Sequence, residues 1–295
     1  MAANVGATFL RIVLGQELTR LREQAGLTGE AAAKKAGCST PTISNVESGK
    51  TGFRRIEQLA KLLEEYGVDE DGTAMLMDCH KQAKGDDWWT TSVSALPSGM
   101  NLFLAWESGA ELVNAWCPGV VNGLLQTKEY AHACILSAKI ANDTTDEFVE
   151  SAVEVRIKRQ KRITEEGMKL NCVMDESALT NMVGSPEILR AQYKAIAELN
   201  ELPNVTVQII PKSAPTYRAT GGDFTILSFD PKRLPEEAMQ VPTPIVACAT
   251  VDAITRVSSK DRQVKQFARR FEVLTRGALP DYETPKFLEQ LAREV

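Results

Sequence analysis

The chain has 295 residues, enough for two modest domains, and its 43% apolar and 25% charged content is ordinary for a globular protein. The net charge of −5 argues weakly against a nucleic-acid partner, but residues 1–68 carry nine basic and seven acidic side chains, whereas the rest carries 25 and 32. The chain has no signal-peptide pattern, no run near the roughly 18 apolar residues of a membrane span, and no closely spaced cysteines. We therefore expect a cytoplasmic protein with reduced thiols, without a membrane segment, a metal site or a disulfide framework.

Five helices are predicted in the first 84 residues. Leu14 and Leu18 recur at helical spacing, and Gly26 is a natural end for this first helix. Gly37 ends the second helix, because glycine adopts the positive φ that turns the chain sharply. The other helices are expected after Thr28, from Thr40 to about Ser48, around Ile56–Leu63, and from Asp71 to Lys84.

The second and third of these helices are separated by only three residues, 37–39, which predicts a helix-turn-helix. The solvent face of the third helix carries short hydrogen-bonding side chains suited to base edges and phosphates: Thr40, Thr42, Ser44, Asn45 and Ser48. Three basic residues follow where the chain can clamp a DNA backbone: Lys50, Arg54 and Arg55. A generic helical bundle is the alternative, and this polar face argues against it.

The segment from Leu14 to Leu63 resembles the Xre/Cro family of repressor domains, through Gly26-Leu27-Thr28, Ile43-Ser44, Glu47 and Gly49. The resemblance implies a five-helix domain whose third helix enters the major groove, and an ion pair between Arg22 and Glu47. By position, the base-reading sites of the family fall on Thr40, Pro41 and Asn45, and its backbone-contacting region falls on Lys50, Arg54 and Arg55. Pro41 lacks a donor and offers only apolar contact, for instance to a thymine methyl group.

Residues 85–100 lack periodicity and are rich in Ser, Thr, Gly and Pro, which predicts a linker between a domain at 1–84 and one at 101–295. The pair Trp88-Trp89 is unusual for a linker, since two indoles expose a large apolar surface. We expect at least one of them to pack on a domain; stacking on nucleic acid is the alternative.

The second domain is predicted to mix strands and helices, so the whole chain is an α+β protein with an all-α head and a mixed α/β body. Six strands are expected at Leu112–Trp116, Leu170–Met174, Val205–Ile210, Phe224–Phe229, Ile245–Ala249 and Ile254–Val257. Helices are expected at Leu102–Ala110, Thr127–Lys139, Thr145–Glu165, Pro186–Leu202, Asp261–Arg276 and, as a peripheral element, Thr284–Arg293.

Residues 88–275 resemble the C-terminal domain of actinobacterial antitoxin-like Xre regulators. The most distinctive segment is Gly123-Leu124-Leu125-Gln126-Thr127, followed by Tyr130-Ala131. The resemblance implies a small acidic protein as a possible partner. The sequence departs from the family near Met239–Val251, where an acidic, aromatic strand is usual.

The segment from Cys117 to Tyr130 is the candidate regulatory site. Its glycines and the helix start after Thr127 predict backbone N–H groups that point outward, which suits a carboxylate or a partner's backbone. The hypothesis places Asn122, Gln126 and Tyr130 around the site, with Leu125 on its apolar wall. The alternative is that the leucines are core residues and the glycines only shape a turn.

Five positive charges lie within seven residues, at Arg156, Lys158, Arg159, Lys161 and Arg162. A solvated helix face is the plainer interpretation, and a patch that binds an acidic protein or flanking DNA is the alternative. Catalysis is not expected: Asp175-Glu176 resembles a carboxylate pair but fits a loop or a helix cap. No phosphate-binding loop or dinucleotide motif is found, so no cofactor is predicted.

Together these features predict a sequence-specific regulator that binds a double-stranded DNA operator as a homodimer. Three modes of control stay open. A small partner protein is the first expectation, a small-molecule ligand in the C-terminal domain is the second, and an antitoxin that sequesters a toxin is the third.

Overall fold

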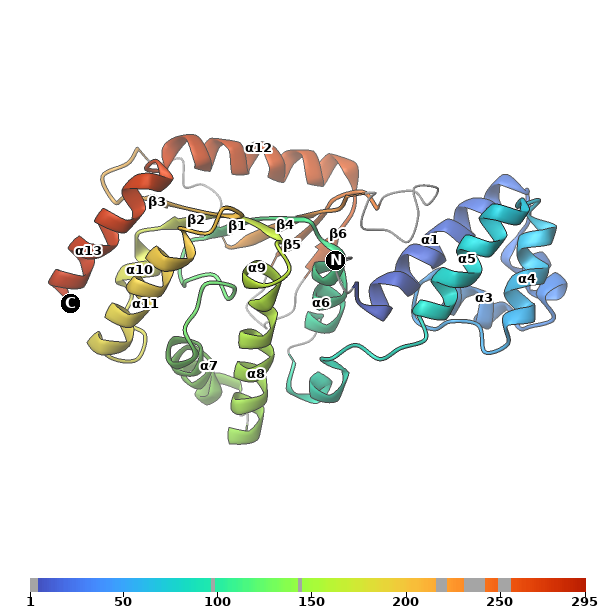
Figure 1. The fold of residues 1–295 in the computed structure, drawn as a ribbon, viewed down its shortest axis with the longest axis horizontal. Helices are drawn as coiled ribbons and strands as arrows, with labels where there is room; N and C mark the ends of the chain where they lie inside the picture. Colours follow the sequence, from blue (N-terminus) through green and yellow to red (C-terminus); the bar gives the residue numbers. More distant parts are fainter. Residues whose placement is uncertain (1–4, 97–98, 143–144, 216–221, 231–241, 249–255) are drawn as a thin grey trace. The chain divides into compact units, whose positions relative to one another are not determined.

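The computed structural model describes residues 5–96, 99–142, 145–215, 222–230, 242–248 and 256–295, and the chain divides into two compact units (Figure 1). The first unit, the head, is helical, and the second, the body, combines a mixed sheet with helices. The predicted α+β class is therefore confirmed. Among the described residues, no helix is long and apolar enough to cross a membrane.

The described residues 5–82 of the head form five helices, and short side chains cap the second and third of them as the sequence predicts. Thr28 accepts a hydrogen bond from the Ala31 N–H, and Ser39 accepts one from the Thr42 N–H. The helices are α1 (Ala7–Gln24), α2 (Gly29–Ala36), α3 (Thr40–Glu47), α4 (Ile56–Glu65) and α5 (Glu70–Gln82).

The predicted linker is more ordered than its composition indicates. It contains a 3-10 helix at Thr90–Ala95, and Trp89 is only 2% exposed. The compact head also includes Leu104–Gly109 and Phe229, so its limits differ from the predicted 1–84. The reason is aromatic packing: the ring centroid of Phe9 lies 5.8 Å from that of Trp106 and 5.5 Å from that of Phe229.

The body is built on a six-stranded sheet of order β3-β2-β1-β4-β5-β6. Strands β1, β2 and β3 are parallel, and β4, β5 and β6 continue the sheet in antiparallel pairs. The strands are β1 (Leu112–Cys117), β2 (Lys169–Asp175), β3 (Val205–Ile210), β4 (Phe224–Ser228), β5 (Ile245–Cys248) and β6 (Arg256–Ser258). All six predicted strands are present. The described residues do not include 249 and 254–255 of the predicted strand ranges. They also do not include 239–241 and 249–251 of the segment that departs from the family.

Helix α12 (Asp261–Gly277) covers one face of the sheet, and α7–α11 lie on the other (Figure 1). Trp116, Phe224 and Phe271 form a core with their neighbours on the α12 side. Because side chains alternate along a strand, Cys117 faces the opposite side. The other helices are α6 (Met100–Gly109), α7 (Lys128–Asn142), α8 (Asp146–Arg159), α9 (Lys161–Thr164), α10 (Ser177–Thr180), α11 (Pro186–Leu199), the 3-10 helix η3 (Asp281–Glu283) and α13 (Thr284–Glu294).

Two helix predictions for the body are corrected. The predicted helix Thr145–Glu165 is divided at Gln160, whose side-chain amide donates to the carbonyl oxygens of Gly123 and Gln126 at 3.1 and 2.6 Å. The last helix, α13, is not peripheral, since it packs on α11 and buries Leu288 and Leu291. Both differences come from contacts with distant segments, which local periodicity does not report.

Candidate functional site

Helix α3 presents the polar face that the sequence predicts. Ile43 and Val46 are buried, which turns the remaining side chains outward. Thr42 and Asn45 are partly exposed, and the exposed members of the predicted DNA-binding set are Thr40, Pro41, Ser44, Ser48, Lys50, Arg54 and Arg55. All nine predicted DNA-binding side chains are therefore accessible.

The hydrogen bonds within the head distinguish Asn45 from its neighbours on α3. The Thr42 hydroxyl lies 2.9 Å from the Ser39 hydroxyl, and Ser48 donates to the carbonyl oxygen of Asn45 at 3.2 Å. The side-chain amide of Asn45 makes no hydrogen bond to any residue that the structure describes. Its donor and its acceptor are thus both available for an adenine edge, the pairing that asparagine makes in the major groove.

An ion pair ties α3 to α1, as the resemblance implies. Arg22 Nε lies 2.7 Å from Glu47 Oε1, and Arg22 Nη2 donates to Glu47 Oε2 at 3.2 Å. A third bond joins Arg22 Nη1 to the carbonyl oxygen of Leu27 at 2.9 Å. The Glu47 carboxylate raises the pKa of Arg22, and both side chains are only 15% exposed. This bidentate geometry fixes the orientation of α3.

Gly15 also positions α3, and the sequence analysis missed it. A Cβ atom at Gly15 would lie 2.5 Å from the carbonyl oxygen of Val46 and 2.6 Å from that of Glu47. Only glycine therefore allows α1 to approach the end of α3 this closely. A glycine inside an apolar helical pattern lowers helix stability. Its presence at position 15 was therefore the sequence signal that could have indicated a close contact.

A basic hollow of about 490 Å³ lies beside the residues that follow α3. It is lined by the predicted Lys50 and Arg54 and also by Arg11 and Lys84, which were not predicted. His80, from α5, closes it and is almost fully buried. Burial, and then the nearby Lys84, lower the pKa of His80, so the ring is neutral at pH 7. The hollow thus gathers four cations where the resemblance places the DNA backbone.

In the body, two of the backbone N–H groups in the loop after β1 bind side chains of the protein. The Leu124 N–H donates to Asn122 Oδ1 at 2.9 Å, and the Thr127 N–H donates to Gln192 Oε1 at 2.8 Å. These two donors are therefore not available to an anion, and recognition by the N–H groups at the start of α7 stays a prediction.

Two of the four candidate regulatory residues are core residues. Leu125 and Tyr130 are fully buried, so neither faces the solvent. Asn122 and Gln126 do line a cavity of about 530 Å³ beside the carboxyl end of β1. The same cavity is also lined by Phe103, Val121, Arg156, Arg159 and Asp223.

The basic run of the sequence divides into an inner and an outer set. The lysines at 158 and 161 are exposed, whereas Arg159 and Arg162 are 8% and 7% exposed and Arg156 is partly buried. Arg156 and Arg159 both reach the cavity. Arg162 instead donates to the carbonyl oxygen of Ala110 at 2.8 Å and pairs with Glu166. The five basic residues of this run therefore do not form a uniformly solvated helix face.

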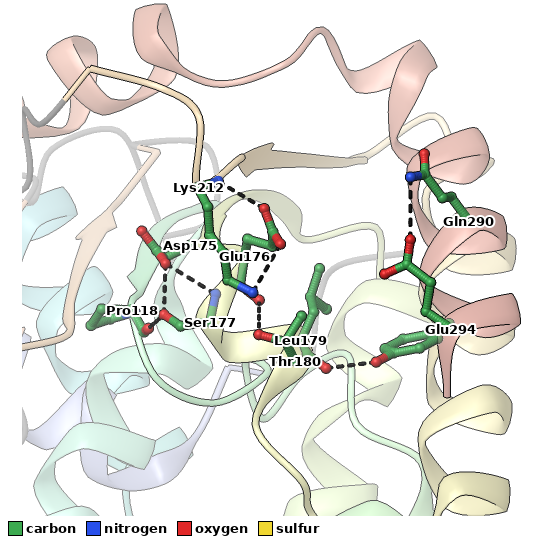
Figure 2. A network of polar contacts seen from close by, with 10 residues as sticks. Pro118, Asp175, Glu176, Ser177, Leu179, Thr180, Lys212, Gln290 and Glu294 are labelled. Atoms are coloured by element: carbon green, nitrogen blue, oxygen red, sulfur yellow. Dashed lines mark hydrogen bonds and ion pairs between the residues drawn. The ribbon is translucent and has the colours of Figure 1, made fainter.

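The carboxylates at the end of β2 have structural contacts (Figure 2). Asp175 Oδ1 accepts from the Ser177 N–H at 3.0 Å, and the Ser177 hydroxyl lies 2.7 Å from the carbonyl oxygen of Pro118. Glu176 accepts from the Lys212 N–H at 2.7 Å and pairs with its ammonium group at 3.1 Å. These contacts join the loops that follow β1, β2 and β3, as the loop and cap interpretation predicts.

Comparison with known proteins identifies both parts of the chain. A family model described as a helix-turn-helix domain matches residues 13–76. A second model, described as a domain of unknown function, DUF5753, matches residues 100–290, more than half of the chain. The chain belongs to the DUF5753 family. Its helix-turn-helix domain makes it a DNA-binding regulator, and its DUF5753 domain contains the arginine-lined cavity. No curated protein matches the chain.

Proposed function

We propose that this DUF5753 protein is a sequence-specific transcription regulator of the Xre type, which reads an operator through α3. The observation that carries the proposal is the free side-chain amide of Asn45, held on an exposed helix that the Arg22–Glu47 pair orients. Thr40, Pro41 and Ser44 supply further contacts on the same helix. Lys50 and Arg54, with Arg11 and Lys84, attract the phosphate backbone.

The proposed regulator acts as a symmetric homodimer. One helix-turn-helix unit contacts few base pairs, and two units on half-sites about 34 Å apart supply the missing affinity. We expect the dimer interface mainly within residues 88–295. Light scattering on the full chain should give twice the mass of one chain, and a monomeric mass in both the free and the operator-bound protein would refute this point.

The body is proposed to receive the regulatory signal by binding, without catalysis. The cavity beside β1 has the size of a small-molecule site and contains charged groups, which favours control by a ligand over control by a partner protein. A small acidic partner protein and an antitoxin role stay predictions. Mass spectrometry of proteins and small molecules that copurify from native cells distinguishes these modes.

Substitution of Asn45 tests the DNA-reading role. An operator is first selected from random duplexes with the wild-type chain. Asn45→Ala should then lower the preference for that operator over a scrambled duplex by about 1–3 kcal/mol, because a base-edge contact is lost. Arg54→Ala is the contrasting variant, and it should weaken both duplexes by similar factors. An unchanged operator preference in Asn45→Ala would show that α3 is misplaced.

A further inference from the structure

Arg156 is a partly buried cation without an acidic partner among the described residues. Its Nη1 donates to Gln126 Oε1 at 2.9 Å, and its other contact is the thiol of Cys134. Burial lowers the pKa of the guanidinium, and the neighbouring Arg159 adds to the decrease, but arginine stays protonated at neutral pH. A charge in such a place is costly unless an opposite charge reaches it.

The cavity next to Arg156 supplies the space for that opposite charge. Its volume of about 530 Å³ falls within the usual range for small-molecule sites. Among the described residues, the charged side chains that line it are Arg156, Arg159 and Asp223. Arg156 has no acidic partner among the described residues, and a singly charged anion balances its one positive charge.

The walls of the cavity favour an anion with an apolar body. Phe103 is buried, and its ring centroid lies 5.4 Å from the guanidinium carbon of Arg159. Val121 adds an aliphatic surface. A Cβ atom at Gly123 would lie 3.6 Å from Arg159 Nη1 and 3.7 Å from Arg156 Nε, so both guanidinium groups approach the same glycine.

The position in the sheet is also that of a ligand site. The cavity lies at the carboxyl end of β1, where the parallel half of the sheet meets its antiparallel half. Ligands of open α/β sheets bind outside the carboxyl ends of the strands. The loop after β1, which lines part of the cavity, is held by the Ser177 hydroxyl, which donates to the carbonyl oxygen of Pro118 at 2.7 Å (Figure 2).

We propose that this cavity binds a small organic monocarboxylate, whose carboxylate pairs with Arg156 while its apolar body packs on Phe103 and Val121. Gln126 is a positioning residue, because its amide oxygen holds the guanidinium and its Nε2 donates to the carbonyl oxygen of Val121 at 2.7 Å. This assignment names the class of ligand for the proposed regulatory site. It rests on the proposed function only in the claim that ligand binding changes operator affinity.

Fluorine NMR on the full chain tests the site with 4-fluorobenzoate as the probe. The wild-type protein should broaden the probe signal, and the uncharged analogue 4-fluorobenzamide should stay sharp. Affinity should fall at least about tenfold in Arg156→Gln, because a charge-assisted pair is lost. The matched control is Lys158→Gln, an exposed charge on the same helix, which should bind like wild type.

A second variant keeps the arginine and supplies its opposite charge from within the protein. Gln126→Glu has nearly the same shape and puts a carboxylate beside Arg156, where the amide oxygen now accepts. It should lose probe binding, and because it also loses the Nε2 donor to the Val121 carbonyl oxygen, a cooperative unfolding transition is the check that the variant is folded. Absence of broadening in the wild-type protein, or equal broadening in wild type, Arg156→Gln and Gln126→Glu, overturns the assignment.

A phosphate probe tests the choice of ligand, and two outcomes separate this assignment from the proposed function. Weaker binding of 4-fluorophenyl phosphate than of 4-fluorobenzoate supports a single-charge site, and the reverse order refutes that choice of ligand. Probe binding by a chain that prefers no DNA sequence refutes the proposed function and leaves the cavity assignment standing. Sequence-selective DNA binding by a chain that does not bind the probe supports the proposed function and refutes the cavity assignment.

Discussion

The basic residues of the head and those of the body have opposite surroundings. In the head, Lys50, Arg54 and Arg55 are exposed and hydrated. In the body, Arg159 and Arg162 are nearly buried within a run that looks equally basic in the sequence. Exposed cations attract a polyanion such as DNA, and salt screens this attraction. Enclosed cations instead need hydrogen-bond or ion-pair partners inside the protein. A high density of basic residues in a sequence therefore does not by itself indicate their function.

The largest expected effect concerns an enclosed arginine. Arg162→Ala should lower the free energy of unfolding of the body by about 3 kcal/mol, because the substitution removes the hydrogen bond to the carbonyl oxygen of Ala110 and the ion pair with Glu166. Urea unfolding measures the loss. Lys161→Ala is the matched control, since its exposed pair with Glu165 should contribute less than about 0.5 kcal/mol. Equal losses would mean that Arg162 is effectively solvated.

The ion pair that orients α3 should have an intermediate effect. A double-mutant cycle on Arg22→Ala and Glu47→Ala should give a coupling of about 1–2 kcal/mol, because the pair is bidentate and mostly shielded from water. The same cycle on Lys35 and Glu65, whose side chains are much more exposed, should give about 0.5 kcal/mol or less. Similar couplings in the two cycles would contradict a special role for Arg22.

The buried histidine of the head predicts a loss of stability in acid. The folded pKa of His80 lies below its ordinary value of 6.5, so the unfolded chain binds a proton more readily. The stabilising contribution is complete above about pH 6.5 and decreases as the pH falls toward the folded pKa. Unfolding free energies at about pH 5 and pH 7 should therefore differ less in His80→Asn than in wild type. His132→Asn, at a partly exposed site, is the control and should not reduce the difference.

The smallest effect concerns one exposed charge of the head. Arg54→Ala should reduce the slope of log affinity for DNA against log salt concentration by about 0.9, the share of one phosphate contact. Arg156→Gln removes an equal charge from the body and should leave the slope unchanged. A change of slope in Arg156→Gln would place the cavity in contact with DNA and remove the distinction between the two sets of cations.

Local signals were sufficient for most of the secondary structure and for the candidate DNA interface. The capping residues Thr28 and Ser39 and the positive-φ glycine Gly37 mark helix ends through contacts within a few residues, so the sequence predicts α2 and α3 closely. The polar face of α3 follows from helical periodicity once Ile43 and Val46 are taken as buried. The sequence by itself thus determined which side chains of α3 are exposed to solvent.

The tertiary structure decided which basic side chains are enclosed and what surrounds them. Arg156 meets Gln126 across 30 residues, and Arg162 meets Ala110 across 52. Gly15 reveals its role only where α1 crosses the end of α3, and Leu125 and Tyr130 are core residues although they flank a polar loop. Helical spacing states which residues share a face, but whether that face meets water or another segment depends on long-range packing. That packing is what turns two arginines of a basic run into the lining of a cavity.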